Sequence, residues 1–161
     1  MLIRELRSQD CNTVRDALIA CCAFTEEEIQ VALEVLEIGL AGGLSGEYPH
    51  FVAEVEQCVC GYICVGKTPL TASTWHLYWI CVHPAVQGRG VGQELLSYVE
   101  AFVRTRSGER LVVETSGQPS YMRTRRFYDD AGYIEVGRIP DFYKSGDDCV
   151  LYCKLLTARG Q

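Results

Sequence analysis

Two periodicities of apolar residues alternate along the chain, and together they predict a sheet with helices packed on it. Alternating or continuous apolar runs predict strands over residues 2–6, 51–55, 59–65, 77–82, 110–115, 133–138 and 149–155. Recurrence every three to four residues predicts helices over residues 10–22, 25–42, 93–107 and 124–131. Strands and helices alternate in mid-chain and hairpins lie at both ends, so we predict a mixed α/β sheet. With no linker or repeat, residues 1–161 are expected to form a single domain.

Polar residues and glycines mark the ends of these elements. Asp10 is placed to cap the first helix, and Thr25-Glu26-Glu27-Glu28 is a capping box for the second, which Gly42-Gly43 ends. A loop containing Pro140 and Gly146 is predicted between the last two strands.

The glycine-rich segment Gln87-Gly88-Arg89-Gly90-Val91-Gly92 lies between a predicted strand and a predicted helix. Glycine adopts backbone conformations closed to other residues and lets a ligand approach closely. The free N–H groups and the dipole of the following helix favour an anion, and Arg89 adds a positive charge. The segment therefore predicts a phosphate-binding turn.

The glycine spacing separates this turn from two familiar phosphate-binding motifs. No lysine follows the last glycine, as the Walker A loop requires. Gln93 stands at the third glycine position of the dinucleotide-binding fingerprint, and the turn lies in mid-chain rather than in an opening βαβ unit.

A Gln-x-x-Gly-x-Gly turn after a strand, preceded by Val82-His83-Pro84, resembles the pyrophosphate loop of the GNAT superfamily of acetyl-CoA-dependent N-acetyltransferases. Tyr128 and Gly132-Tyr133 resemble the second signature of that family, and the order of elements is similar from Leu2 to Leu155. The resemblance implies a single N-acetyltransferase domain of α/β class. Its mixed central sheet would splay between two central strands and be flanked by about four helices.

The resemblance also implies acetyl-CoA as cosubstrate and assigns residues to it. Backbone N–H groups of the glycine turn would bind the pyrophosphate, namely those of Gln87, Gly88, Arg89, Gly90, Val91 and Gly92. The strand edge would pair with the pantetheine amides as an added strand does, at Ile80, Cys81 and Val82. A splay makes this edge available because it leaves backbone groups unpaired.

Two catalytic roles follow from the resemblance. Tyr128 matches the family tyrosine that protonates the departing thiolate, a role that suits a phenol pKa of about 10; the alternative is that Tyr128 only packs. The amine must also lose a proton. Glu114, near the end of the strand that faces the splay, is the predicted general base, with His76 and Glu54 as other candidates and a water chain as the alternative to a single side chain.

These assignments predict an acyltransferase that moves an acetyl group to a primary amine by direct attack in a ternary complex. The alternatives are a non-catalytic CoA-binding regulatory module and ping-pong transfer through a cysteine, for which Cys81 is nearest in sequence to the thioester. The acceptor is a small-molecule amine or a protein amino group. Tyr121 stands where family members often carry Asn. The segment 141–148 resembles the closing loop of ribosomal-protein-alanine-type members, the alternative being an exposed turn.

Composition and charge narrow the class further. The net charge of −6 argues against nucleic acid as a partner. Two arginine clusters, around 104–110 and 123–126, are either solvated surface or sites that steer an anionic cofactor. No apolar run approaches the roughly 20 residues that span a bilayer, and the N-terminus lacks a signal-peptide pattern, so a cytoplasmic protein without a membrane partner is expected. The nine cysteines lack the spacing of a zinc site, which predicts reduced, mostly buried thiols and no metal. The sequence is compatible with a homodimer.

Overall fold

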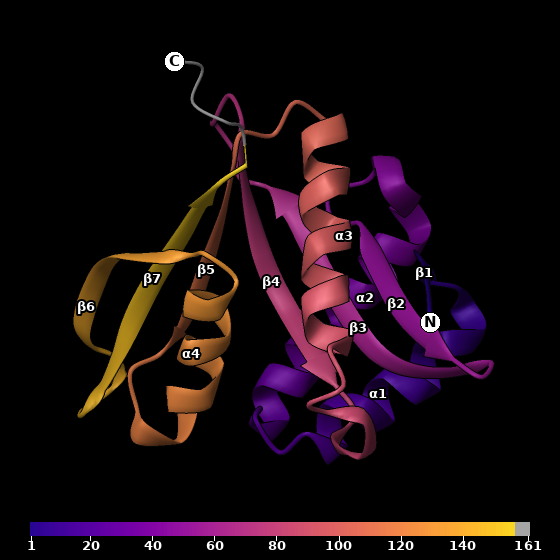
Figure 1. The fold of residues 1–161 in the computed structure, drawn as a ribbon, viewed down its shortest axis with the longest axis horizontal. Coiled ribbons are helices and arrows are strands. Elements are labelled where there is room, and N and C mark those ends of the chain that lie inside the picture. Colours follow the sequence, from indigo (N-terminus) through magenta and orange to yellow (C-terminus); the bar gives the residue numbers. More distant parts are fainter. Residues whose placement is uncertain (157–161) are drawn as a thin grey trace.

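Seven strands form one mixed sheet in the computed structural model, which describes residues 1–156 (Figure 1). In spatial order they are β1 (Leu2–Glu5), β2 (His50–Val55), β3 (Cys58–Lys67), β4 (Thr74–Val82), β5 (Arg110–Ser116), β7 (Asp147–Leu155) and β6 (Ile134–Lys144). All neighbouring pairs are antiparallel except β4 and β5, which are parallel. The mixed α/β sheet predicted from the sequence is confirmed.

Helices cover both faces of this sheet. Helices α1 (Cys11–Ala20) and α2 (Glu26–Gly42) pack on one face, where they share a core with β2 and β3. Helices α3 (Val91–Thr105) and α4 (Met122–Asp130) lie on the other face. The predicted capping box is present at the start of α2, where Glu28 N–H donates to Thr25 Oγ1 at 3.2 Å and Thr25 N–H donates to Glu28 Oε2 at 2.7 Å.

The apolar side chains on one face of α3 form the centre of the core on that side of the sheet. Leu95, Leu96, Val99 and Val103 are at most 1% exposed and pack on Ile63 and its neighbours. Burying an aliphatic side chain of this size contributes about 1.5–3 kcal/mol. This packing fixes the start of α3, and with it the glycine turn, against the sheet.

A β-bulge in β4 changes which face its side chains occupy. Val65 of β3 pairs with Leu77 and Cys64 pairs with Trp79, so Tyr78 has no partner opposite it. Leu77 therefore joins the core beneath α3, whereas Cys81 joins the core beneath α1 and α2.

The parallel strands β4 and β5 stay together over only part of their length. Pairing runs from Thr74 with Arg110 to Leu77 with Val113, and no pair follows. Residues 79–82 of β4 thus keep one edge on β3 and leave the other edge unpaired by β5. The predicted splay between two central strands is confirmed (Figure 1).

Two local predictions need correction. The loop predicted around Pro140 is a hairpin, because β6 and β7 continue to a turn at Ser145-Gly146; proline is tolerated there because β6 is an edge strand. Asp10 does precede α1, but its carboxylate does not cap that helix. It binds the Arg4 guanidinium at 2.7 Å instead, since a charged donor makes the stronger hydrogen bond.

Candidate functional site

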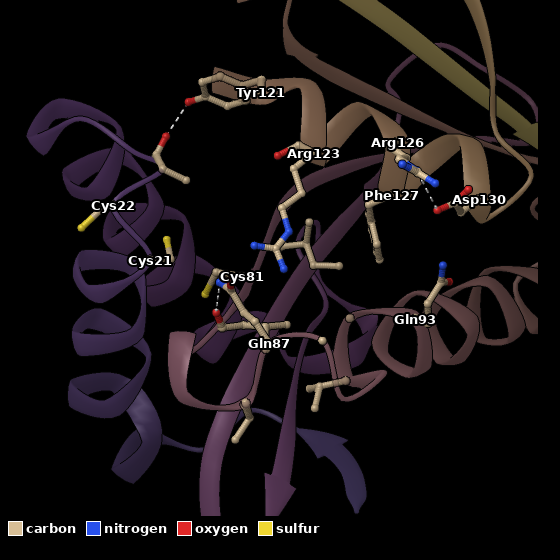
Figure 2. A pocket seen from close by; sticks show the side chains of 18 of the residues that line it. Cys21, Cys22, Cys81, Gln87, Gln93, Tyr121, Arg123, Arg126, Phe127 and Asp130 are labelled. Carbon is tan, nitrogen blue, oxygen red and sulfur yellow. Dashed lines mark hydrogen bonds and ion pairs between the residues drawn. The ribbon is translucent and has the colours of Figure 1, made fainter. Parts of the chain in front are cut away.

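A cavity of about 800 Å³ opens where β4 leaves β5 (Figure 2). Its walls come from the end of β4, the glycine turn, α4 and the connection between α1 and α2. The lining residues are Cys21, Cys22, Ala23, Phe24, Ile80, Cys81, Val82, Val86, Gln87, Gly88, Gly90, Val91, Gly92, Gln93, Ser120, Tyr121, Arg123, Thr124, Arg126, Phe127 and Asp130. Eight of the nine residues predicted to bind the cofactor are among them; Arg89 is not.

The glycine turn presents unpaired backbone donors to this cavity. Gly88 and Gly90 have φ of +77° and +83°, a region that favours glycine, and Gly90 is the N-cap of α3. The first bond of the helix runs from Glu94 N–H to Gly90 O at 3.0 Å. The N–H groups of Val91, Gly92 and Gln93 therefore have no helical partner, and the helix dipole adds to their preference for an anion.

Gly92 also sets how close α4 approaches. A Cβ at this position would lie 3.2 Å from Phe127 Cε2 and 3.7 Å from Val82 Cγ2. The absent side chain lets the Phe127 ring border the cavity directly above the glycine turn.

The unpaired edge of β4 forms one wall. His83 N–H bonds to Cys60 O of β3 at 2.8 Å. Because backbone groups alternate along a strand, the Val82 and Ile80 groups point to the other edge, toward the cavity. The side-chain amide of Gln87 donates to Val82 O at 3.0 Å (Figure 2). A ligand amide that pairs with Val82 O would have to replace this contact.

Two arginines of α4 add positive charge to the same space. Arg126 makes only a long, exposed ion pair of 3.8 Å with Asp130, and Arg123 forms no ion pair within residues 1–156. Figure 2 shows Arg123 pointing from α4 into the cavity. A cavity that combines free N–H donors with one unpaired and one weakly paired guanidinium group suits a ligand with several negative charges.

Tyr121 bridges the cavity. Its hydroxyl donates to Ala23 O, which joins the start of α4 to the connection between α1 and α2 (Figure 2). The sequence indicated only that this position departs from the family pattern. It gave no reason to include 21–24 in the site, because that segment carries no residue with a characteristic spacing or charge.

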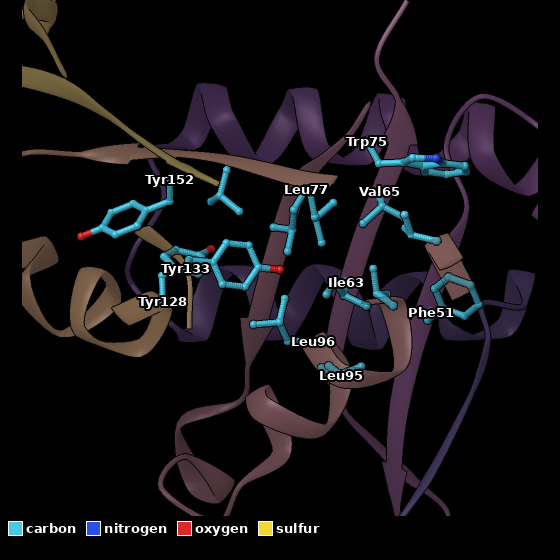
Figure 3. Close-up of a cluster of buried hydrophobic side chains, with 14 of the residues drawn as sticks. Phe51, Ile63, Val65, Trp75, Leu77, Leu95, Leu96, Tyr128, Tyr133 and Tyr152 are labelled. Carbon is cyan, nitrogen blue, oxygen red and sulfur yellow. The ribbon is translucent and has the colours of Figure 1, made fainter. Parts of the chain in front are cut away.

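Tyr128 does not line the cavity. It is 3% exposed, and its ring lies 5.7 Å from that of Tyr133 and 5.8 Å from that of Tyr152 (Figure 3). Burial raises the pKa of Tyr128 above its ordinary value of 10. The phenol thus stays protonated at neutral pH, but burial moves its pKa away from that of a thiol. Its role as an acid stays a prediction.

Glu114 is exposed and follows directly after the last β4–β5 pair. Val113 faces α3, so Glu114 faces away from it, as does His76 beside Leu77. The His76 ring lies 4.9 Å from that of Tyr78, and burial lowers the pKa of His76 while Glu114 partly offsets this. Glu54, the third candidate base, is held in an ion pair with Arg4 at 2.8 Å. The predicted bases are therefore not all brought together.

The thiols nearest the cavity are poor nucleophiles or lie at its rim. Burial raises the pKa of Cys81, and also that of Cys21, so that both favour the neutral thiol. Cys22 is exposed. No group of three metal-ligating side chains was found among residues 1–156, and no helix of that part of the chain is long and apolar enough to cross a membrane.

Comparisons with known proteins agree with this geometry. The model of the acetyltransferase (GNAT) family matches residues 12–133. An uncharacterized N-acetyltransferase of Methanocaldococcus jannaschii is 28% identical over 160 residues, covering 96% of this chain and 91% of the relative. A crystal structure from Desulfovibrio desulfuricans, assigned to GNAT acetyltransferases, is 37% identical with a TM-score of 0.92, covering 97% of this chain and 99% of that one.

Two more distant structures are similar in fold alone. One, from Salmonella typhimurium and assigned as an acetyltransferase, contains its cofactor acetyl-CoA; it is 21% identical with a TM-score of 0.77, covering 100% of this chain and 96% of that one. The ribosomal-protein-S18-alanine N-acetyltransferase of Escherichia coli is 16% identical with a TM-score of 0.76, covering 99% and 96%.

Proposed function

The chain belongs to the acetyltransferase (GNAT) family, and from that membership we propose that it transfers an acetyl group from acetyl-CoA to a primary amine. The observation that carries the proposal is the single cavity in which the glycine turn at the start of α3 meets the unpaired edge of β4. In that cavity the glycine turn offers N–H donors to the phosphate groups of a ligand, and the edge of β4 offers backbone groups to its amides.

The residues present fit acetyl-CoA. The N–H groups of Val91, Gly92 and Gln93 would hold the pyrophosphate, and Arg123 and Arg126 would neutralise further phosphate charge. The backbone groups of Ile80 and Val82 would pair with the pantetheine amides. The choice of ligand is supported by the Salmonella neighbour, a protein of similar fold that contains acetyl-CoA.

The cosubstrate supplies a thioester whose acetyl carbon accepts the amine. As a C–N bond forms and the C–S bond breaks, the amine must give up a proton and the sulfur must gain one. We assign proton removal to Glu114, directly or through water, because it is exposed at the strand separation. Tyr128 is the proposed donor to sulfur, and it begins protonated because burial raises its pKa.

The acceptor would approach from the face of the sheet opposite α3. Glu114, His76 and Tyr78 lie on this face, beside the strand separation. A carboxylate flanked by aromatic rings suits an amine, which is cationic in solution. The acceptor class proposed is therefore a primary amine, on a small molecule or on a protein.

Two measurements test the proposal. Calorimetry with acetyl-CoA should show binding, and a panel of primary amines should release CoA thiol in the presence of the protein. Val136→Ala, an exposed change on β6 away from the cavity, is the matched control and should alter neither. Binding without release by any amine would favour the CoA-binding regulatory module, and absence of binding would refute both readings.

A further inference from the structure

Asp147, the first residue of β7, is a buried carboxylate without a cationic partner. It is 8% exposed. One oxygen, Oδ1, accepts a 2.5 Å hydrogen bond from Ser116 Oγ. Within residues 1–156, no lysine, arginine or histidine forms an ion pair with it, and Oδ2 accepts no hydrogen bond. Burying a carboxylate is costly unless a positive charge or further donors accompany it.

The surrounding hydrogen bonds hold this carboxylate in place. Ser116 Oγ also accepts from Gln118 N–H at 3.1 Å. Arg125 Nη1 donates to Ser116 O at 2.7 Å and to Gln118 O at 2.9 Å. The Arg125 guanidinium thus binds main-chain carbonyls, and the second oxygen of the Asp147 carboxylate keeps its capacity to accept.

Asp147 lies on the same face as the proposed base. Ser116 and Glu114 are two residues apart on β5, so their side chains share a face at a spacing of roughly 7 Å. The Tyr143 hydroxyl contacts Cys149 Sγ at 3.7 Å on that face. Burial, then the contact with Cys149, and then the charges of Glu114 and Asp147 raise the pKa of Tyr143. Burial, and then the charges of Glu28 and Asp147, raise the pKa of Tyr121 of the cavity wall.

Contact with a carboxylate favours the protonated form of an amine. The amine that attacks the thioester must be neutral, so a buried carboxylate is a poor partner for it. A cationic group that keeps its charge throughout the reaction is a suitable partner for Asp147. The exposed Glu114 is a suitable partner for the amine that loses its proton.

On the basis of the proposed function, we propose that Asp147 binds a second, non-reacting cationic group of the acceptor. The substrate class is then a primary amine that carries a second positive charge, such as an aliphatic diamine or a lysine-like side chain beside a second cation.

The test compares cadaverine, a diamine, with pentylamine, which has the same carbon chain and one amine. For the unmodified protein at saturating acetyl-CoA, we expect kcat/KM to be about tenfold higher for cadaverine, as one charge-assisted hydrogen bond predicts. Asp147→Asn keeps the shape of the side chain. It should raise KM for cadaverine about tenfold, with KM for pentylamine, KM for acetyl-CoA and kcat nearly unchanged.

The control is Asp148→Asn, because Asp148 is the neighbouring carboxylate and pairs with Arg138 at 3.4 Å. It should leave the cadaverine preference intact. Equal kcat/KM for the two amines in the unmodified protein would overturn the inference without any variant. So would an Asp147→Asn protein in which both amines lose activity alike and the melting temperature falls, since the Ser116 bond would then be structural only.

If neither amine is acetylated, calorimetry of cadaverine with the CoA-loaded protein replaces the kinetics, and absence of binding refutes the role of Asp147. Failure of acetyl-CoA itself to bind would refute the proposed function instead, so the two failures are distinguishable.

Discussion

His50 is enclosed between α2 and β3, with Nδ1 2.9 Å from Tyr62 Oη and Nε2 3.1 Å from Val35 O. Burial lowers its pKa from 6.5 to about 4, which the bond to the Val35 carbonyl only partly offsets. Below pH 6.5 the unfolded chain therefore binds a proton at His50 that the folded chain does not bind.

The free energy of unfolding should consequently fall by about 3 kcal/mol as the pH drops from 6.5 to 4, and be insensitive to His50 above that window. Urea unfolding across this range measures the slope. His50→Gln, which cannot titrate, should show a shallower slope whatever its absolute stability. Equal slopes in the two proteins would contradict the assignment.

Tyr128 belongs to a group of three tyrosines that the sequence does not distinguish by burial. Tyr128→Phe removes one hydroxyl without changing the packing of the ring, so a proton-donor role predicts a fall in kcat of roughly a hundredfold with little change in stability. Tyr152→Phe is the matched control, because this residue is equally buried in the same cluster. An unchanged kcat for Tyr128→Phe would assign that residue to packing alone.

At the scale of elements, the turn before α3 depends on backbone conformation. Gly90 has φ of +83°, and a Cβ at this position would meet nothing within 4 Å. Gly90→Ala would strain this conformation by about 1–2 kcal/mol, or move the N–H groups of the helix start. We expect acetyl-CoA affinity measured by calorimetry to fall about tenfold.

Gly42→Ala provides the comparison for this change. Gly42 lies at the end of α2 with φ of −90°, and a Cβ there would meet nothing within 4 Å. It should stabilise the protein slightly, by less than about 1 kcal/mol, and leave affinity unchanged. Similar losses of affinity in both variants would show that the effect of Gly90→Ala is not local.

The periodicity of α3 and the valine-rich β5 were enough to predict the sheet, because each follows from local burial on one face. The splay was expected only from the resemblance to the GNAT family, since no local pattern encodes it. The β-bulge at Tyr78 could not be predicted from the sequence, since it arises from the register between β3 and β4 rather than from the sequence of either strand. The β6–β7 hairpin extends further than predicted, because Pro140 signals a loop except on an edge strand.

The candidate site likewise has a part that the sequence predicts and a part that it does not. The glycine turn has a local signature and lies where it was predicted. The contribution of 21–24 and the bridge from Tyr121 to Ala23 depend on tertiary contacts across nearly a hundred residues, which spacing alone does not encode. Asp147 was placed in a segment that resembles a closing loop, with an exposed turn as the alternative; only its bond to Ser116 of another strand reveals its burial.

For the whole molecule, the cavity and the thiols around it favour direct transfer. Burial raises the pKa of Cys81 and of Cys21, so neither thiolate is available for acetylation at neutral pH. The intact mass of the protein should stay unchanged after mixing with acetyl-CoA in the absence of amine. An acetyl adduct that disappears when amine is added would establish ping-pong transfer instead.

The separation of β4 from β5 has a consequence for how long the protein survives in a cell. Four residue pairs alone join the strands of the two halves of the sheet in the region described, so the rest of that edge of β4 is open to a ligand. On the proposed function that ligand is acetyl-CoA. A ligand at a hundred times its Kd stabilises a fold by about 2.7 kcal/mol. Resistance of the protein to proteolysis would then rise and fall with the supply of acetyl-CoA, so that abundance as well as rate reports nutritional state.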